Sequence, residues 1–147
     1  MLLTINIKNI DINNIFYNKS TENNIIKNSE FVKILYSNDI FSVNSLIIDF
    51  KFNFINISKQ YKKIYFNFDT SKNIESISKL VDLEYNLLNL LNESKLIPLY
   101  NLKNYFLMKQ YFYVNHNHNH NHNHNIYLKI SGIWKNSKNY GLIFKFI

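Results

Sequence analysis

Hydrophobic and polar residues alternate along two stretches of the chain, and a period of two predicts strands with one buried face. In the stretch from Leu46 to Phe54 the apolar parity holds Leu46, Ile48, Phe50, Phe52 and Phe54. In the stretch from Tyr61 to Phe68 it holds Ile64, Phe66 and Phe68. Because successive side chains of a strand point to opposite faces, we expect both sets to meet in one core.

The period then becomes helical between residues 71 and 94. Apolar residues recur at positions 74, 77, 80, 81, 87, 88 and 91, and the side of the helix that they form is expected to pack on the core through Ile77, Val81 and Leu88. Ser71 and Glu75 suit its first turn, and Pro98 disfavours helix at the residue before it. Glu84 falls on the apolar side, and a lone buried carboxylate is more often a satisfied structural group than a general base.

The remaining segments are shorter and mostly strand-like. Residues 105–114, from Tyr105 to Val114, are apolar or aromatic on both parities, which predicts a strand buried on both faces or lying at an interface. We also expect strands at 3–7, 31–36, 126–134 and 140–147, the last two forming a hairpin, and a polar loop at 18–29. The prediction is one α+β domain over residues 1–147, with five to seven strands in a sheet or small barrel and a long helix inserted between strands.

Composition leads us to expect a reducing compartment for this domain and gives it a positive charge. The 147 residues include no cysteine, which excludes disulfides and thiolate metal sites. No apolar run approaches the ~18 residues that a membrane span needs, and no signal peptide is evident. The net charge of +7 comes entirely from lysine, since the chain has no arginine. Extremely AT-rich coding also favours Lys, Asn, Ile, Phe and Tyr, so part of this excess reflects mutational bias.

The residue patterns of common catalytic sites are missing from the sequence. With two glycines in the chain, Gly132 and Gly141, a glycine-rich phosphate loop is effectively excluded. No HExxH motif and no nucleophile elbow is present. We therefore expect a non-catalytic protein without a cofactor, and rank an enzyme third among the possible functions.

The outward parity of several strands combines tyrosine with lysine. Lysine neutralises phosphate and tyrosine stacks on bases, as on the sheet surfaces of single-strand binders. Tyrosine is also common on half-exposed strands, and a partner protein or a second copy would cover such a face equally well. The candidate nucleic-acid-binding residues are Tyr61, Lys63, Tyr65, Lys109, Tyr111, Tyr113, Tyr127 and Lys129.

The C-terminal hairpin carries a resemblance to a viral family. Its sequences YLKISGIW, residues 127–134, and YGLIFKF, residues 140–146, resemble the closing "KISGIW…GLTxKF" hairpin of small uncharacterised proteins of giant nucleocytoplasmic DNA viruses. The resemblance extends upstream through residues 80–88 and 99–103, and covers roughly residues 61–147.

The same hairpin is more distantly similar to that of viral and phage OB-fold proteins that bind single-stranded DNA. The similarity implies an OB-like fold in which Gly132 and Gly141 lie where strands bend or pass closely. It also implies a role in viral replication or packaging, in the host cytoplasm or nucleus or in the virion. Single-stranded DNA binding is thus our leading hypothesis. The alternative is a structural or protein-interaction module of a virion, with no nucleic-acid binding, which could form a homo-oligomer.

An alternating Asn-His repeat at residues 115–125 brings five histidines together, at positions 116, 118, 120, 122 and 124. Such a tract can bind transition metals weakly, but a specific site needs fixed geometry and supporting hydrogen bonds. We favour repeat expansion into a tolerant loop and assign no metal site.

Replacing all five histidines with serine should therefore leave the melting temperature unchanged, because a repeat loop carries few tertiary contacts. Thermal melting of both proteins with and without EDTA checks this. A midpoint that falls with EDTA in the histidine protein alone would show a metal site.

Overall fold

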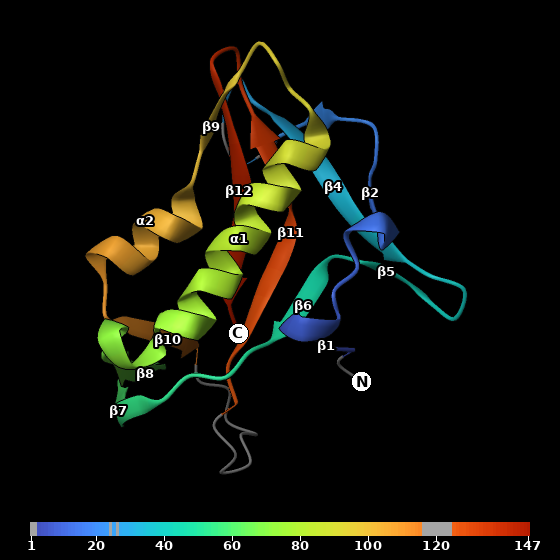
Figure 1. The fold of residues 1–147 in the computed structure, drawn as a ribbon. Helices are drawn as coiled ribbons and strands as arrows, with labels where there is room; N and C mark the ends of the chain where they lie inside the picture. The colour runs from blue at the N-terminus through green and yellow to red at the C-terminus, as the bar shows by residue number, and fades with distance from the viewer. Residues whose placement is uncertain (1–2, 24, 26, 116–124) are drawn as a thin grey trace.

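The computed structural model describes residues 3–23, 25, 27–115 and 125–147 (Figure 1). The helices are α1, Ile74–Leu91, and α2, Asn101–Met108, with short 3-10 helices at Ile7–Asn9, Ile12–Asn14 and Thr70–Asn73. The strands are β1 Ile5–Asn6, β2 Ile15–Tyr17, β3 Thr21–Glu22, β4 Glu30–Ser37, β5 Ser42–Asn44, β6 Leu46–Asp49, β7 Phe54–Gln60, β8 Lys63–Phe68, β9 Ile97–Leu99, β10 Tyr111–Asn115, β11 Tyr127–Lys135 and β12 Asn139–Phe146. In the described residues strands β1 to β8 precede the two α-helices, which are separated by β9 and followed by β10, β11 and β12.

These strands form two sheets, neither of which closes into a barrel. The larger has nine strands, with β1, β6, β11, β12 and β9 in that order, while β4 pairs with β11 and also with β2, β3 and β5. The smaller has the order β10-β8-β7 and is antiparallel throughout. The predicted β-rich α+β class is confirmed. The described residues hold more strands than the five to seven expected, because several have only two to four residues.

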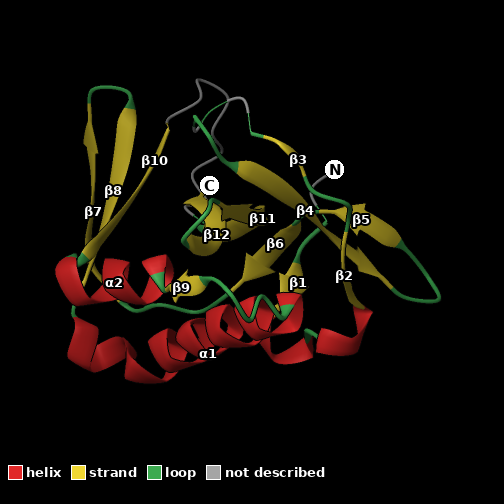
Figure 2. Ribbon diagram, turned by 90° about the horizontal axis from the view of Figure 1, so that it is seen from above, coloured by secondary structure: helices red, strands yellow, loops and turns green. Residues whose placement is uncertain are grey.

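Both helices lie on one side of the larger sheet, and the three-stranded sheet projects beside it (Figure 2). The part of the chain that the structure describes has no helix long and apolar enough to cross a membrane.

Three phenylalanines, Phe50, Phe52 and Phe112, connect the two sheets through one core. The predicted strand 46–54 ends at Asp49, and the chain then crosses to the smaller sheet, where β7 begins. At the crossover Asn73 bonds both backbone groups of Asn53, at 2.6 and 3.1 Å, in place of a neighbouring strand. The alternation persists nevertheless: the Phe50 and Phe52 rings are 5.2 Å apart, and both contact Phe112. The expectation that they share a core is confirmed, as is the packing of α1 on it.

Helix α1 forms at the predicted place but is shorter than 71–94. Asp69 accepts hydrogen bonds from the backbone N–H and hydroxyl of Ser71, at 3.0 and 2.7 Å, and so begins the 3-10 turn that leads into the helix. The helix ends at Leu91 because Asn92 adopts the left-handed conformation, with φ 55° and ψ 47°.

The prediction of a strand from Tyr105 to Val114 is wrong for its first part, which belongs to helix α2. This helix has Tyr100 at its N-cap, which offers no capping side chain. The buried carboxylate of Glu84, from α1, accepts from the N–H groups of Leu102 at 2.8 Å and Lys103 at 3.0 Å. These are the second and third positions of the helix, which an N-cap side chain normally satisfies. A residue 18 positions upstream thus caps α2.

The C-terminal hairpin forms as predicted from β11 and β12. Gly132 lies at an irregularity in its register, where a Cβ would overlap the Val32 carbonyl oxygen and the Phe31 ring. A Cβ on Gly141 would lie 3.0 Å from the Leu99 carbonyl oxygen. Both glycines therefore stand where chains pass closely, as expected.

Replacing Glu84 with Ala should destabilise the fold by ~1–3 kcal/mol, because two buried N–H groups lose their acceptor. Glu84→Gln retains an acceptor oxygen and should cost less. Urea unfolding measures the stability of both variants. Asp82→Ala is the control, because Asp82 is exposed on the same helix, and its stability should lie within ~0.5 kcal/mol of wild type. Equal effects of Glu84→Ala and Asp82→Ala would contradict the capping role.

Glu84 should also make stability depend on pH. Burial raises the pKa of Glu84 above its ordinary 4.5, although the Leu102 and Lys103 N–H groups pull it down. The folded protein therefore keeps this proton to a higher pH than the unfolded chain does. Its contribution to stability is complete below about 4.5 and declines as pH rises through the raised folded-state pKa. Urea titrations across this pH range should show that the free energy of unfolding of Glu84→Gln rises relative to that of wild type as pH rises. A constant difference would be inconsistent with the shift.

Candidate nucleic-acid interface

One face of the three-stranded sheet brings four of the eight predicted site residues together, and Lys109 joins them from the C-cap of helix α2. On the central strand β8, Lys63 and Tyr65 alternate with the buried Ile64 and Phe66. The register with β10 places Tyr113 opposite Tyr65 and Tyr111 opposite Asn67. The polar parity of both strands therefore points away from the core. We call the surface formed by Lys63, Tyr65, Lys109, Tyr111 and Tyr113 the tyrosine–lysine face.

The three tyrosine rings of this face form one continuous aromatic surface. The Tyr65 ring centroid lies 5.8 Å from that of Tyr111 and 6.0 Å from that of Tyr113, with the ring planes tilted by 52° and 40°. Tyr113 is 41% exposed and the other two rings are half-buried. Beyond them on the same face, Asn67 donates to the Asn56 side chain at 2.6 Å. A planar ligand on this face would therefore contact tyrosine rings, with the side-chain amides of Asn56 and Asn67 beside them.

Lysine ammonium groups lie against these rings. The Lys63 Nζ is 4.5 Å from the Tyr113 centroid, and the Lys109 Nζ is 5.8 Å from that of Tyr111, both within cation–π range. Residues 54–68 and 109–115 contain four lysines, at 59, 62, 63 and 109, and no acidic residue. The smaller sheet is therefore a positively charged unit with aromatic rings on its surface.

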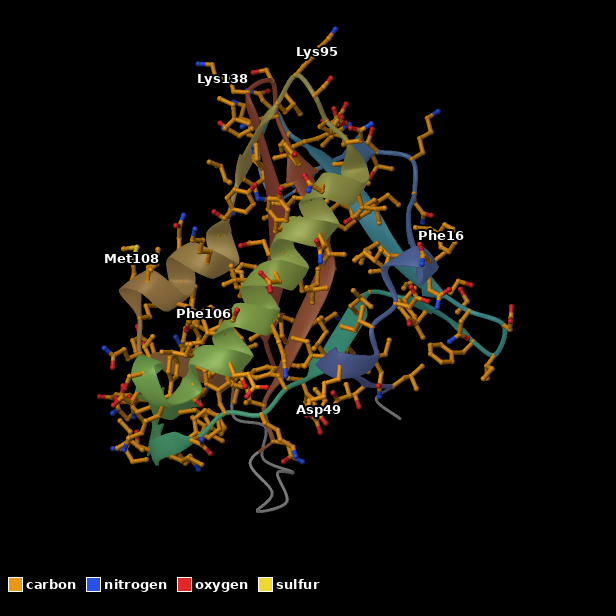
Figure 3. The ribbon with its side chains drawn as sticks, viewed as in Figure 1. Phe16, Asp49, Lys95, Phe106, Met108 and Lys138 are labelled. Atoms are coloured by element: carbon orange, nitrogen blue, oxygen red, sulfur yellow. The ribbon has the colours of Figure 1, made fainter. Side chains whose placement is uncertain are left out.

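Tyr105 supports this face from helix α2, and the sequence did not single it out. Its hydroxyl donates to the Tyr111 carbonyl oxygen at 2.6 Å, and its ring lies 5.1 Å from the Lys109 Nζ. Burial raises the pKa of Tyr105, so the hydroxyl keeps the proton that it donates. Phe106, the next residue, contacts Phe112 beneath the face, at 6.0 Å between ring centroids (labelled in Figure 3).

Three predicted residues lie elsewhere. Tyr61 is not on the strand, which begins at Lys63; it occupies the β7–β8 turn with φ 56° and is 99% exposed. The two-residue turn places it at the tip of the hairpin, beyond the tyrosine–lysine face. Tyr127 and Lys129 belong to β11 of the larger sheet, opposite Asp49 and Ile47 of β6. Their parity is outward, but the structure puts them on a different sheet.

A hollow of about 890 Å³ lies near the β11–β12 turn. One of its lysines, Lys135, forms ion pairs: its Nζ lies 3.0 Å from Glu93 and 3.6 Å from Glu30, and these carboxylates raise the pKa of Lys135. Lys27 and Lys95 also line this hollow, together with the acidic residues Glu22, Glu30 and Glu93. None of its described lining residues is aromatic, so it lacks the ring surface of the tyrosine–lysine face.

Metal chemistry finds no support in the described part of the chain, where no three His, Asp or Glu side chains are grouped to hold an ion. The histidine repeat lies outside the described residues, apart from its flanking asparagines.

Comparison with known proteins gives no match: no protein-family model, curated protein or solved structure resembles this chain significantly.

Proposed function

We propose that this protein binds single-stranded DNA without catalysing a reaction, through the tyrosine–lysine face of its smaller sheet. The observation that carries the proposal is the convergence of Tyr65, Tyr111 and Tyr113, with Lys63 and Lys109 against their rings. Unstacked bases would lie on the rings and the lysines would neutralise the adjoining phosphates. Since lysine acts as a point charge and the chain has no arginine, binding should depend weakly on sequence.

The free energies of the contacts favour replacing each lysine–tyrosine contact with contacts to DNA. A lysine that leaves an exposed tyrosine ring gives up a cation–π contact of ~0.5–1 kcal/mol. A base that stacks in its place gains ~1–3 kcal/mol, and the freed ammonium meets a phosphate. The ligand thus replaces the weaker contact of each lysine with a stronger one.

The viral context and the OB-like relationship are part of this proposal. Both rest on the sequence resemblance of the C-terminal hairpin, residues 127–134 and 140–146. The open sheets mean that the proposed binding surface is a sheet face and not the groove of a closed barrel.

Replacing Tyr65 with Ala should weaken binding to a single-stranded oligonucleotide by ~1–3 kcal/mol, measured by fluorescence anisotropy. Tyr85→Ala is the matched control, because Tyr85 is 52% exposed on α1, away from this face. We expect a smaller loss for Tyr61→Ala, since Tyr61 lies in the turn beyond the other rings.

Replacing Lys63 with Gln should lower affinity and reduce the log–log salt slope by ~0.7, without altering sequence preference. Lys138→Gln, in the turn at the opposite end of the molecule (labelled in Figure 3), should change neither. If wild-type protein does not bind a long single strand at low salt, the proposal is wrong. Tyrosine variants that change self-association in ultracentrifugation but not DNA binding would establish the virion or protein-interaction function instead.

A further inference from the structure

A small hollow adjoins the tyrosine–lysine face between β10 and the C-terminal half of β12. Its volume is about 250 Å³, and Tyr113 belongs both to its lining and to the face. This volume exceeds that of a single water site but is below the 300–1,000 Å³ of pockets for drug-sized ligands. It suits one ring system. The other lining residues are Tyr105, Val114, Asn115, Phe144, Lys145 and Phe146.

The β10 side of the hollow is a strand edge, where the Tyr113 backbone groups have no hydrogen-bond partner among the described residues. The Phe68 N–H donates to the Gln110 carbonyl oxygen at 3.0 Å, and antiparallel ladders alternate, so Phe112 and Val114 also bond to β8. Tyr113 therefore directs its N–H and C=O away from β8. The corresponding carbonyl of Tyr111 is already satisfied by the Tyr105 hydroxyl.

The β12 side is a second such edge. Tyr127 and Ile147 exchange two backbone hydrogen bonds, at 2.8 and 2.9 Å, which makes Lys129 and Lys145 the next bonded pair. Phe144 and Phe146 consequently direct their N–H and C=O groups away from β11. Strand β9 pairs with β12 only over residues 139–141, so it does not reach them.

We infer that this hollow binds one base of the DNA strand held on the tyrosine–lysine face, an inference that rests on the proposed function. Aromatic side chains supply stacking surfaces, and the two strand edges supply donors and acceptors for the polar rim of a base. Lys145 is exposed and suits the attached phosphate, and none of the described residues that line the hollow is acidic. Because Tyr113 borders both surfaces, a strand that stacks on the face reaches the hollow without a break.

The test fills the hollow from outside. Asn115 is exposed on its rim, so Asn115→Trp should occupy the space without removing a core contact. Asn86→Trp, at an exposed position of α1, is the matched control. Thermal melting verifies that both variants fold, and the probes are an oligothymidylate and an abasic oligonucleotide of equal length.

Asn115→Trp should lose about ten-fold or more in affinity for the oligothymidylate and bind the abasic strand as wild type does, because only a base enters the hollow. Asn86→Trp should match wild type on both probes. Unchanged affinity for the oligothymidylate, or equal loss on both probes, would overturn the inference and leave the proposed function standing. A wild-type protein that binds neither probe would overturn the proposed function itself.

A second variant removes the charge of Lys145, the lysine that lines the hollow. Lys145→Gln should weaken binding of the oligothymidylate and reduce the salt slope by ~0.7, whereas Lys138→Gln should not. An unchanged salt slope in Lys145→Gln would refute the phosphate contact at the hollow.

Discussion

The carboxylate of Glu84 at the start of helix α2 is the contact on which the arrangement of the candidate interface depends. Taking a carboxylate out of water is unfavourable, and two charge-assisted hydrogen bonds from Leu102 and Lys103 offset that cost. They fix where α2 begins relative to α1. From there Tyr105 reaches the free edge of β10, and its bond to the Tyr111 carbonyl holds the strand that carries two of the three tyrosines. A buried acid thus positions a basic surface.

The same surface is held from beneath by phenylalanine packing. Phe112 lies on the inner side of β10, with its ring centroid 4.7 Å from that of Phe68 and 4.2 Å from that of Phe146. The first of these rings belongs to the smaller sheet and the second to the larger one. Because the cluster spans both sheets, the smaller sheet cannot move as a separate unit without opening aromatic contacts. The outward tyrosines therefore stand on a rigid support, which lowers the entropy lost when a base stacks on them.

Local periodicity was enough to predict what is determined within one segment. It gave the buried parity from Leu46 to Phe54, the helical face of α1, the inward carboxylate of Glu84 and the closing hairpin. It could not give α2, because the group that caps this helix lies 18 residues from its partner and the residues before it carry no capping signal. Nor could it give the tyrosine–lysine face as a unit. That face requires the register of β10 on β8, which brings Tyr113 opposite Tyr65 across 48 residues, and the hollow requires β12 as well.

Mutational bias affects how many lysines the chain has, but it does not determine where in the fold they lie. AT-rich coding can account for the number of lysines, but it does not decide which of them receive an acidic neighbour. Among the described residues, the lysines in ion pairs are Lys79, with Glu75 on α1, and Lys135, with Glu30 and Glu93. Lys63 and Lys109 meet tyrosine rings instead, on a sheet whose segments contain no acid at all. A carboxylate partner would neutralise a lysine and compete with phosphate for it, whereas a ring leaves its charge intact. Lys63 and Lys109 thus combine a charge without an acidic partner and a neighbouring tyrosine ring. This coincidence of charge and rings is the physical basis of our proposal that the smaller sheet binds an anionic, base-bearing ligand.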